Sequence, residues 1–497
     1  MLRRSHSDPM SEDTTITVFD AVRALAFIGD LSMGQPVDHS LRTAWLAGTI
    51  ATQAGCNASQ IEAVQHVALL RWSGCTANAQ EFADLLEDDV LGRQALLASV
   101  QPRMRQPHAP LPGGVLAMAH IHCEIAGDIA NTLGLSPATE AALRTIFEAY
   151  DGSGVPGLLQ GEDVPLATYV VALASDLEIF GRLYGLDKAL ALVRGRANSL
   201  YPAFLVEASS PHAGEWMKRL DTPVAPWTDV ADQPPSMLGR VGLELVGDVI
   251  DLKLAWMTGY SRRVATLARD CSAQLGMTEP LRQRTYKAGL IHGIGRASVP
   301  NAIWNAAEPL PAASLERLRL VPYWTSRAAG QIDGLAAEAE IASFAFERRD
   351  GSGYFRGRSG MAMPLEGQIV AAAEQWVSHR TRRPWRPELT EAQSLELMQK
   401  DVDGGRFDQE VFTALLACVR PSTAAKPVAP VQDDQSLSQR ELEVLRCISQ
   451  GDNTKQVARA LGISPSTVRT HVERVFRKLG CSTRAAATLK ASTRGLL

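Results

Sequence analysis

The fold is decided by the stretch HSLRTAWLAGTIATQAG at residues 39–55, which aligns with YSRRVATLARDCSAQLG at residues 260–276 at an offset of 221. In the first stretch Leu41, Ala44 and Ala47 recur at the spacing of one helix face, and the second stretch keeps an equivalent spacing. β-Branched residues show no sustained alternation along either stretch. The pattern therefore predicts an all-α fold.

The similarity extends beyond this pair. LLRWSGCTANA at 69–79 aligns with LIHGIGRASVP at 290–300, again at an offset of 221. YDGSGVPGLLQGEDVPL at 150–166 aligns with RDGSGYFRGRSGMAMPL at 349–365, at an offset of 199. The difference of 22 places extra residues in the first copy, between 80 and 120. Collinear blocks at constant offsets indicate a tandem duplication.

Bulk composition narrows the class of protein. The chain has 497 residues, enough for three or four domains, and its 45% hydrophobic and 21% charged content is typical of a soluble globular protein. No stretch approaches the length of a membrane span, and the polar start MLRRSHSDPMSEDTT is unlike a secretory signal. Seven scattered cysteines without a CxxC pair favour a reducing cytoplasm.

Charge is distributed unevenly along the chain. Residues 437–497 contain eleven Lys and Arg against four Asp and Glu, a charge of +7, so the remainder of a chain with net charge −4 carries −11. A basic module on an acidic body suggests that only the C-terminal part meets nucleic acid. A solvated basic face would give the same count.

Breaker-rich segments predict the domain boundaries. The stretch PSTAAKPVAPVQDDQ at 421–435 is typical of a linker, and the proline-rich stretch at 209–235 is a second one. We expect a disordered tail, two helical domains and a C-terminal module, separated by these linkers, at residues 1–15, 16–208, 236–420 and 436–497.

The duplicated unit resembles the HD-GYP branch of the HD-domain phosphohydrolases. The resemblance covers about residues 20–205 and 238–400, and rests on LIHGIGRASVPNAIWN (290–305), DGSGY (350–354) and MPLEGQIVAAAEQW (363–376). It implies helical domains in which His and Asp side chains hold two or more metal ions. Such metals generate hydroxide and neutralise a phosphodiester.

Compared position by position with that family, most of the ligands are replaced. Three histidines remain at ligand positions: His39, His122 and His292. The other positions hold Arg71, Trp72, Ile146, Phe147 and Ser175 in the first copy, and Tyr260, Gly293, Val321, Ala345, Phe346 and Glu374 in the second. We therefore expect remnants of two metal centres, with no metal, no cofactor and no catalytic residue.

The two DGSG segments admit two interpretations. Asp151 and Asp350 resemble catalytic carboxylates, but Asp followed by Gly-Ser-Gly is also a common tight-turn composition. We favour the turn. Glu148 and Glu347 occupy matching positions just before these segments and are expected to cap or brace the loop.

The last 61 residues predict four helices. Ser438 and Glu441 form a capping box that opens the first helix. Asn453 or Asp452 caps the second helix, which is expected to bury Val457, Ala460 and Leu461. After a turn at Gly462, Ser464 and Pro465 start the third helix. The third helix buries Val468, Val472, Val475, Phe476 and Leu479 and exposes cations. Ser482 is expected to cap the fourth, roughly 483–493. A short helix, a tight turn and a one-sided cationic helix indicate a helix-turn-helix.

This module closely resembles the LuxR/FixJ-type DNA-binding domain. The matching pieces are LSQRELEVL (437–445), NTKQVA (453–458), ISPSTVRTHV (463–472) and KLG (478–480). The resemblance implies contacts with double-stranded DNA through Lys455, Ser464, Ser466, Thr467, Arg469, Thr470, His471, Glu473, Arg474 and Lys478. Arg469, Thr470 and Glu473 would face the major groove, and Lys455, Thr467, Arg474 and Lys478 the phosphates.

Glu473 departs from the basic or polar residue common at its position in that family. It could accept a hydrogen bond from cytosine N4, or it could pair with Arg469 or Arg477 along the helix. The sequence leaves both roles open.

These observations predict a cytoplasmic, bacterial-type transcription regulator. A catalytically inactive body of two HD-GYP-like domains would serve for dimerisation, for sensing a small-molecule or nucleotide effector, or for both. The expected partners are double-stranded DNA and a second copy of the chain, joined through the fourth helix around residues 485–491. The alternative is a metal-dependent HD-domain phosphodiesterase of cyclic dinucleotides, with residual activity, fused to a DNA-binding domain.

Overall fold

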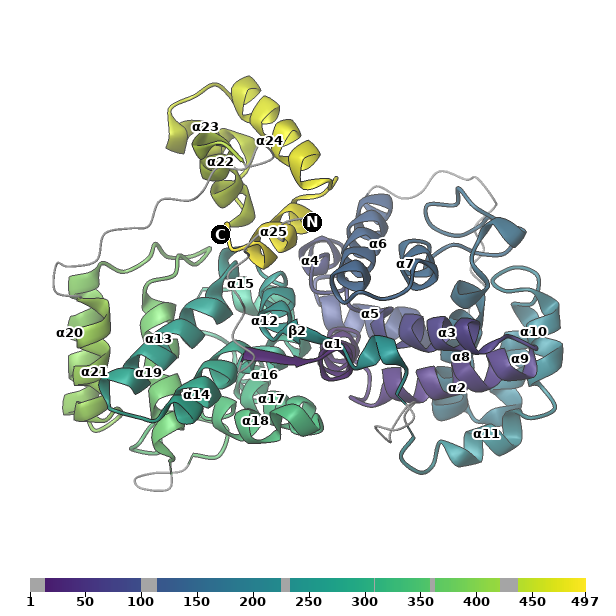
Figure 1. Cartoon of the computed structure of the whole chain (residues 1–497), viewed down its shortest axis with the longest axis horizontal. Helices are drawn as coiled ribbons and strands as arrows, with labels where there is room; N and C mark the ends of the chain where they lie inside the picture. Colours follow the sequence, from purple (N-terminus) through teal and green to yellow (C-terminus); the bar gives the residue numbers. More distant parts are fainter. Residues whose placement is uncertain (1–13, 100–113, 225–232, 308, 358–362, 421–436) are drawn as a thin grey trace, which may run out of the picture.

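The computed structural model describes residues 14–99, 114–224, 233–307, 309–357, 363–420 and 437–497. Figure 1 shows two helical lobes side by side with a smaller helical domain above them. The described chain is almost entirely helical, which confirms the predicted all-α class. One short antiparallel pair of strands, β1 (Thr15–Thr17) and β2 (Arg240–Gly242), was not predicted.

The first lobe contains eleven described α-helices: α1 (Val18–Ser32), α2 (His39–Gln53), α3 (Ala58–Leu70), α4 (Ala79–Leu86), α5 (Asp89–Ala98), α6 (Val115–Thr132), α7 (Pro137–Arg144), α8 (Leu166–Tyr184), α9 (Leu186–Gly195), α10 (Ala203–Ser209) and α11 (Ala213–Arg219). The described second lobe runs through α12 (Glu244–Asp251), α13 (Tyr260–Gln274), α14 (Glu279–Ile291), η6 (Ile294–Ser298), α15 (Asn301–Asn305), α16 (Ala312–Arg319), α17 (Val321–Ala329), α18 (Ala336–Ala342), α19 (Leu365–His379), α20 (Glu391–Asp403) and α21 (Gln409–Val419). The domain above them consists of α22 (Gln439–Ser449), α23 (Thr454–Leu461), α24 (Pro465–Leu479) and α25 (Arg484–Thr493).

The duplication inferred from the sequence is visible in the helices. Helices α2 and α13 begin 221 residues apart, as do α3 and α14, and α8 and α19 begin 199 residues apart. A buried contact between an aspartate and a serine is also repeated. Asp30 accepts hydrogen bonds from the backbone N–H and the hydroxyl of Ser40, and Asp251 accepts the equivalent two bonds from Ser261. Burial raises the pKa of Asp30 to about 8 and that of Asp251 to about 7.

The two lobes share one hydrophobic core. Helix α1 of the first lobe packs against α12, α17 and η6 of the second, and apolar side chains of both lobes form a single buried cluster. Strands β1 and β2 each precede the first helix of a lobe and pair antiparallel, with Ile16 opposite Val241. Equivalent segments that meet antiparallel are the arrangement expected of a local twofold axis between the copies.

A buried ion pair joins the lobes. The Lys253 ammonium donates to Asp89 Oδ2 at 2.8 Å, and the backbone N–H of Asn301 donates to Asp89 Oδ1 at 2.7 Å. Both charged side chains are at most 1% exposed. Charges removed from water in this way persist only when they are paired, so the pair holds the lobes in a defined register.

The domain limits expected from the sequence need two corrections. Residues 209–235, expected to be a linker, contain α11, whose Trp216 packs into the core of the first lobe. Thr15, expected to end a disordered tail, begins β1 and is buried because it pairs with Gly242. The second expected linker, 421–435, lies outside the described residues. No described helix combines the length and apolar composition that a bilayer crossing requires.

We predict that Lys253→Met lowers the free energy of unfolding by about 1.5–3 kcal/mol, because it removes the charged hydrogen bond to Asp89 and leaves that buried carboxylate with Arg93, 3.8 Å away, as its remaining cation. Urea denaturation measures the change. Lys188→Met, on the exposed surface of α9, is the matched control and should change stability by less than about 0.5 kcal/mol. Equal effects of the two substitutions would contradict a stabilising role for the ion pair.

Candidate functional site

In the first lobe, a buried arginine lies among the residues at positions aligned with the family's metal ligands; following the sequence prediction, we call this group, and its counterpart in the second lobe, a remnant centre. The positions aligned with the first His, the His of the His-Asp pair and the final Asp hold His39, Arg71 and Ser175, and the fold brings these three together. Arg71 Nη2 donates to Ser175 Oγ at 2.5 Å and lies 3.0 Å from His39 Nε2. Burial lowers the pKa of Arg71 to about 10, so the guanidinium remains charged at neutral pH.

The arginine determines the tautomer of the histidine. A guanidinium only donates, so His39 Nε2 accepts from Arg71, and His39 Nδ1–H donates to Glu178 Oε2 at 2.8 Å. Burial lowers the pKa of His39, against the opposing effect of Glu178. The nitrogen lone pair that would ligate a metal is therefore used by the guanidinium.

In the second lobe, too, the Nε2 lone pair of a histidine accepts from an arginine, but the arginine stands at a different position in the sequence. Arg296 Nη2 donates to His292 Nε2 at 2.8 Å, and His292 Nδ1 donates to the carbonyl of Gly289 at 2.6 Å. Tyr260, at the first His position, donates from its hydroxyl to Glu374 Oε1 at 2.7 Å, and Arg296 lies 3.8 Å from the same carboxylate. Burial lowers the pKa of His292 well below its usual value.

His122, the third histidine at a ligand position, also contacts groups of the protein itself. Its Nε2 donates to the carbonyl of Arg71 at 2.7 Å, and its ring packs at 4.8 Å from the ring of Phe147, which replaces a family histidine. Burial lowers the pKa of His122 to about 4. Within the described residues, no group of three or more His, Cys, Asp or Glu side chains is placed to hold a metal ion. The donor set present does not fit a metal pair.

Sequence comparison found the missing ligands but not the cations that replace them. Arg71 stands at a ligand position, yet its role as a centre-filling group required the structure. Arg296 and Glu178 were not singled out at all. The available signal for Arg296 was its place one helical turn after His292 in GLIHGIGRAS, where a side chain at i+4 faces the same side.

The turn interpretation of the DGSG segments is confirmed. Asp151 Oδ1 accepts from the backbone of Ser153 at 2.8 Å, and Asp350 Oδ1 accepts from that of Ser352 at 2.9 Å. Glu148 accepts from the backbone N–H groups of Gly157 and Leu158, at 3.0 and 3.1 Å. In the second lobe, Glu347 accepts from the backbone of Arg356 at 2.6 Å. The two glutamates brace the loops, as expected.

The C-terminal domain follows its predicted capping pattern. Ser438 and Glu441 form a capping box at α22, Asn453 caps α23, and Ser464 caps α24 by accepting from the backbone of Thr467. Gly462 takes the left-handed conformation (φ 64°) that the tight turn between α23 and α24 requires. Two expectations were wrong: Thr483, not Ser482, caps α25, and α23 buries Ala458 while Ala460 is exposed.

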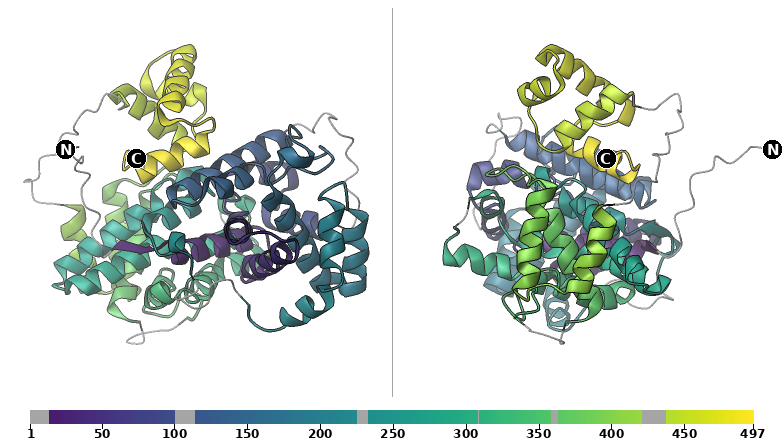
Figure 2. Two further views of the ribbon diagram at one scale, coloured as in Figure 1. Left: turned by 45° about the vertical axis from the view of Figure 1, so that its right-hand side comes forward. Right: turned by 90° about the vertical axis from the view of Figure 1, so that its left-hand side faces the viewer.

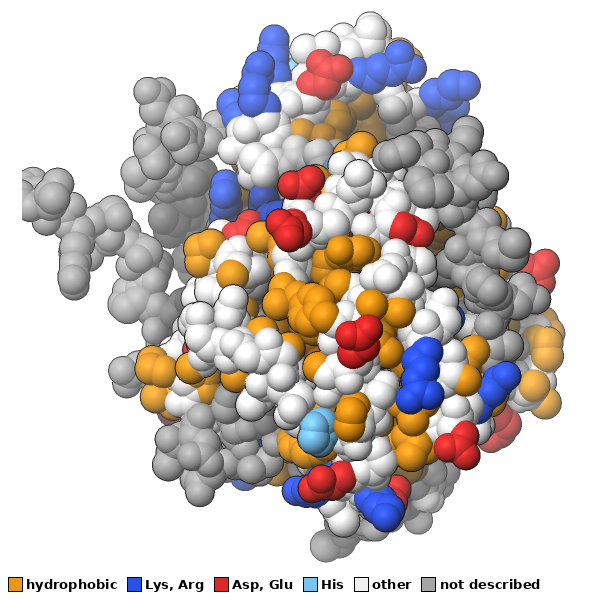
Figure 3. Space-filling model, turned by 90° about the vertical axis from the view of Figure 1, so that its right-hand side faces the viewer, with side chains coloured by type: hydrophobic (Ala, Val, Ile, Leu, Met, Phe, Trp, Pro, Cys, Tyr) orange, Lys and Arg blue, Asp and Glu red, His pale blue; other side chains and the backbone are white. Residues whose placement is uncertain are grey.

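Helix α24 is one-sided. Val468, Val475 and Leu479 are buried, Val472 and Phe476 pack beside them, and the exposed face carries Arg469, Thr470, Glu473, Arg474 and Arg477. Figure 3 shows Lys and Arg side chains gathered over this domain. Within the described residues, Glu473 forms no ion pair with Arg469 or Arg477.

The remaining predicted contact residues differ in their surroundings. Lys455, Ser466 and Thr467 are exposed, and the hydroxyl of Ser464 lies 2.7 Å from that of Ser466 and 2.8 Å from that of Thr467. His471 is half-buried. Lys478 points back toward α22, where its ammonium donates to Glu441 Oε2 at 2.7 Å. Its charge is thus directed toward the protein.

The C-terminal domain rests on both lobes through α25. Ala486 and Leu489 are buried in the core cluster of the body, against α6 and α12. Figures 1 and 2 show α25 lying along the body, with α24 farther from it. Ser482 donates to Glu124 through its backbone and hydroxyl, at 2.6 and 2.9 Å, and Lys490 pairs with Asp128 at 3.2 Å. The helix face expected to mediate dimerisation is therefore covered here.

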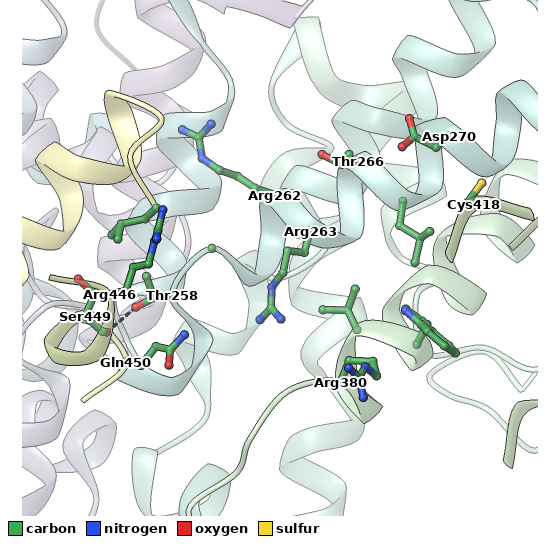
Figure 4. Close-up of a pocket in the computed structure, with 15 residues that line it drawn as sticks. Thr258, Arg262, Arg263, Thr266, Asp270, Arg380, Cys418, Arg446, Ser449 and Gln450 are labelled. Carbon is green, nitrogen blue, oxygen red and sulfur yellow. Dashed lines mark hydrogen bonds between the residues drawn. The ribbon is translucent and has the colours of Figure 1, made fainter. Parts of the chain in front are cut away.

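The second lobe also makes polar contacts with the C-terminal domain. Thr258 donates to the carbonyl of Ser449 at 2.7 Å, and Arg382 pairs with Asp452 at 2.9 Å. Beside the first contact lies a cavity of about 570 Å³ with Arg262, Arg263, Arg380 and Arg446 in its walls (Figure 4). Leu497 also lines it. The domain junction is therefore incompletely filled.

A second cavity, of about 540 Å³, opens over the remnant centre of the second lobe. Its walls include Arg296 and Glu374 from the centre and the aromatic side chains Tyr354, Trp304 and Trp385. Arg296 is 2% exposed, and its Nε and Nη1 have no hydrogen-bond partner among the described residues. Buried donors of this kind favour an anionic ligand.

Comparison with known proteins agrees with this architecture. The HD-domain family matches residues 244–411, and the luxR family of bacterial regulatory proteins matches residues 435–491. The 3′3′-cGAMP-specific phosphodiesterase 3 of Vibrio cholerae is 24% identical over 423 residues, 78% of this chain and 91% of the relative. A solved structure of a cyclic GMP-AMP-specific phosphodiesterase from the same organism covers 82% of this chain and 98% of its own, with TM-score 0.58 and 19% identity.

The C-terminal domain has relatives of its own. A probable transcriptional regulatory protein NarL of Mycobacterium tuberculosis is 49% identical over 73 residues, which span 15% of this chain and 32% of the regulator. The chain thus contains an HD domain followed by a C-terminal DNA-binding domain of the luxR family. Its body relates to cyclic dinucleotide phosphodiesterases.

We predict that Arg71→Met destabilises the protein by about 1–3 kcal/mol, because it leaves His39 Nε2 and the Ser175 hydroxyl buried without the guanidinium that donates to them. Thermal and urea unfolding measure the loss. Arg194→Met, at an exposed position of α9, provides the control. A variant as stable as the control would mean that Arg71 does not hold the remnant centre together.

Proposed function

We propose that this protein is a sequence-specific transcription regulator that binds double-stranded DNA through α24. In this proposal the HD-like body has no phosphodiesterase activity and serves for dimerisation, effector sensing or both. The observation that carries the proposal is the exposed cationic face of α24, combined with arginines in both remnant centres. A regulator of this kind acts in the cytoplasm, where the DNA is.

The exposed residues of α24 divide by their expected roles. Arg469, Thr470 and Glu473 lie where a helix in the major groove meets base edges, and Lys455, Thr467 and Arg474 are placed for phosphates. Ser464, Ser466 and His471 lie at the margin of this surface. Lys478 contributes less than the sequence implied, because its ammonium is held by Glu441.

Glu473 is proposed to read a base. Because it forms no ion pair with its helical neighbours in the described structure, its carboxylate is available to accept a hydrogen bond from cytosine N4. This favours a site containing a C·G pair at the corresponding position.

Dimerisation through α25 would require the domain to leave the body. The buried positions of Ala486 and Leu489 and the Ser482–Glu124 bonds hold α25 in place. Burial opposes ionisation of Glu124, but hydrogen bonds from Thr483 and Ser482 outweigh it and lower its pKa. We therefore propose that the docked chain is the resting state and that release of α25 permits a homodimer on a twofold-symmetric operator.

The cavity over the second remnant centre is the proposed effector site. Its volume of about 540 Å³ suits a small molecule, the unpartnered donors of Arg296 suit a phosphate, and its aromatic walls suit a base. The relatives named as phosphodiesterases of 3′3′-cGAMP motivate a cyclic dinucleotide as the class of effector.

We predict that Arg469→Ala weakens binding to the specific operator by about 1–3 kcal/mol and leaves binding to random DNA nearly unchanged, because a base contact carries sequence information. The operator is first identified by genome-wide mapping, and the affinities are then compared at one salt concentration. Arg459→Ala, on the exposed surface of α23, is the control. Equal losses on both DNAs would assign Arg469 to the phosphates instead.

The alternative function is a phosphodiesterase with residual activity, favoured by the relatives of the body. We expect purified protein to contain less than stoichiometric iron and manganese and to leave 3′3′-cGAMP intact, since the histidine lone pairs are used by arginines. Metal analysis and product chromatography check both expectations. Stoichiometric metal together with hydrolysis would establish the alternative.

A further inference from the structure

We propose a second ligand site, for a nucleotide, at the junction where both lobes meet the C-terminal domain. A cavity of about 730 Å³ lies there, lined by residues of the first lobe such as Gln80, of the second lobe such as Trp256, and of the C-terminal domain such as Gln456. This volume falls in the range of small-molecule sites. Figure 1 shows how the three parts converge around α15 and α25.

The charge of the cavity wall selects an anion. Five cationic side chains line it, Lys253, Arg382, Arg383, Arg386 and Arg484, and none of its lining residues is an Asp or Glu. Lys253 is neutralised by Asp89 and Arg382 by Asp452, both from outside the wall. Arg484 is exposed and has no ion pair within the described chain. The wall therefore keeps an excess of positive charge, and guanidinium groups match the geometry of phosphate oxygens.

The remaining wall residues select a flat ring rather than a bare phosphate. Trp385 is 37% exposed and offers a ring for stacking, while Trp256 is fixed by its indole donating to Asn305 Oδ1 at 3.0 Å and by the Arg383 guanidinium 4.1 Å from its ring centre. The side-chain amide of Gln450 and the Nε2 group of Gln456 supply donors and acceptors suited to a base edge, while Gln80 is engaged with Asp84 and Asn305. Phosphate with an aromatic base is the chemistry of a nucleotide.

This site is distinct from the cavity over the remnant centre. The two cavities share Arg383, Trp385 and Arg386 as a common wall, but only the junction cavity is lined by Arg484, and only the other by Arg348. A substitution of Arg484 therefore tests the junction cavity, and a substitution of Arg348 tests the cavity over the remnant centre. The inference goes beyond the proposed function, because ligand binding here is measurable without DNA.

A ligand in the junction would favour the docked arrangement. It would contact Arg484 at the start of α25 and Arg382 of the body together, and these contacts exist only while the domain rests on the body. Thermodynamic linkage then requires that release of α25 lowers the affinity for the nucleotide. The junction site would thus couple nucleotide level to the freedom of the DNA-binding domain.

The test is calorimetric titration of the full chain with three probes: 3′3′-cGAMP, ATP and inorganic phosphate. We expect at least one of the two nucleotides to bind, and to bind at least tenfold more tightly than inorganic phosphate. Arg484→Glu should weaken that binding at least tenfold, because it reverses a charge in the wall. Arg494→Glu, at the other end of α25 and outside the wall, makes the same charge change and should leave the affinity unchanged.

Three results would overturn the proposal. They are no binding of either nucleotide, phosphate binding as tight as nucleotide binding, and nucleotide binding that survives Arg484→Glu but disappears in Arg348→Glu. The last result would place the ligand over the remnant centre. Melting temperatures check that the variants fold, and Arg484→Ala repeats the test with a neutral side chain if the glutamate variant is destabilised.

Discussion

The guanidinium of Arg71 lies against His39 and Ser175, and that of Arg296 lies against His292 and near Glu374. Each places one positive charge, in a buried site, among the side chains that remain from a metal-ligand series. A guanidinium carries positive charge into the site but has no coordination position at which water could be activated. Each histidine is held as a neutral acceptor, so the centre is stable without a cation from solution.

The two copies place an arginine beside a buried histidine from different positions in the chain. In the first copy, Arg71 itself stands at a ligand position. In the second copy, Arg296 lies in η6, four residues after His292. The surrounding helices and braced DGSG loops are retained in both. In both copies a buried guanidinium donates to the Nε2 of a histidine at a position aligned with a family ligand.

The two lobes together form the surface on which the C-terminal domain rests. The lobes share a core and the buried Asp89–Lys253 pair, and α25 packs onto both of them. The Arg382–Arg386 segment lies between the cavity over the second centre and the junction cavity, and Arg382 reaches Asp452 of the C-terminal domain. This short segment therefore connects both cavities with the C-terminal domain through direct contacts.

Local features of the chain were predictable from its sequence. Helix periodicity, the capping boxes at Ser438 and Asn453 and the turn at Gly462 depend on neighbouring residues, so they could be predicted from the sequence. The position of Arg71 beside His39 and Ser175, the position of Arg296 near Glu374, the pairing of β1 with β2, and the burial of Ala486 and Leu489 against the body depend on residues far apart in the chain. Only the tertiary structure decided these, because burial and charge pairing arise when distant segments are brought together and water is removed.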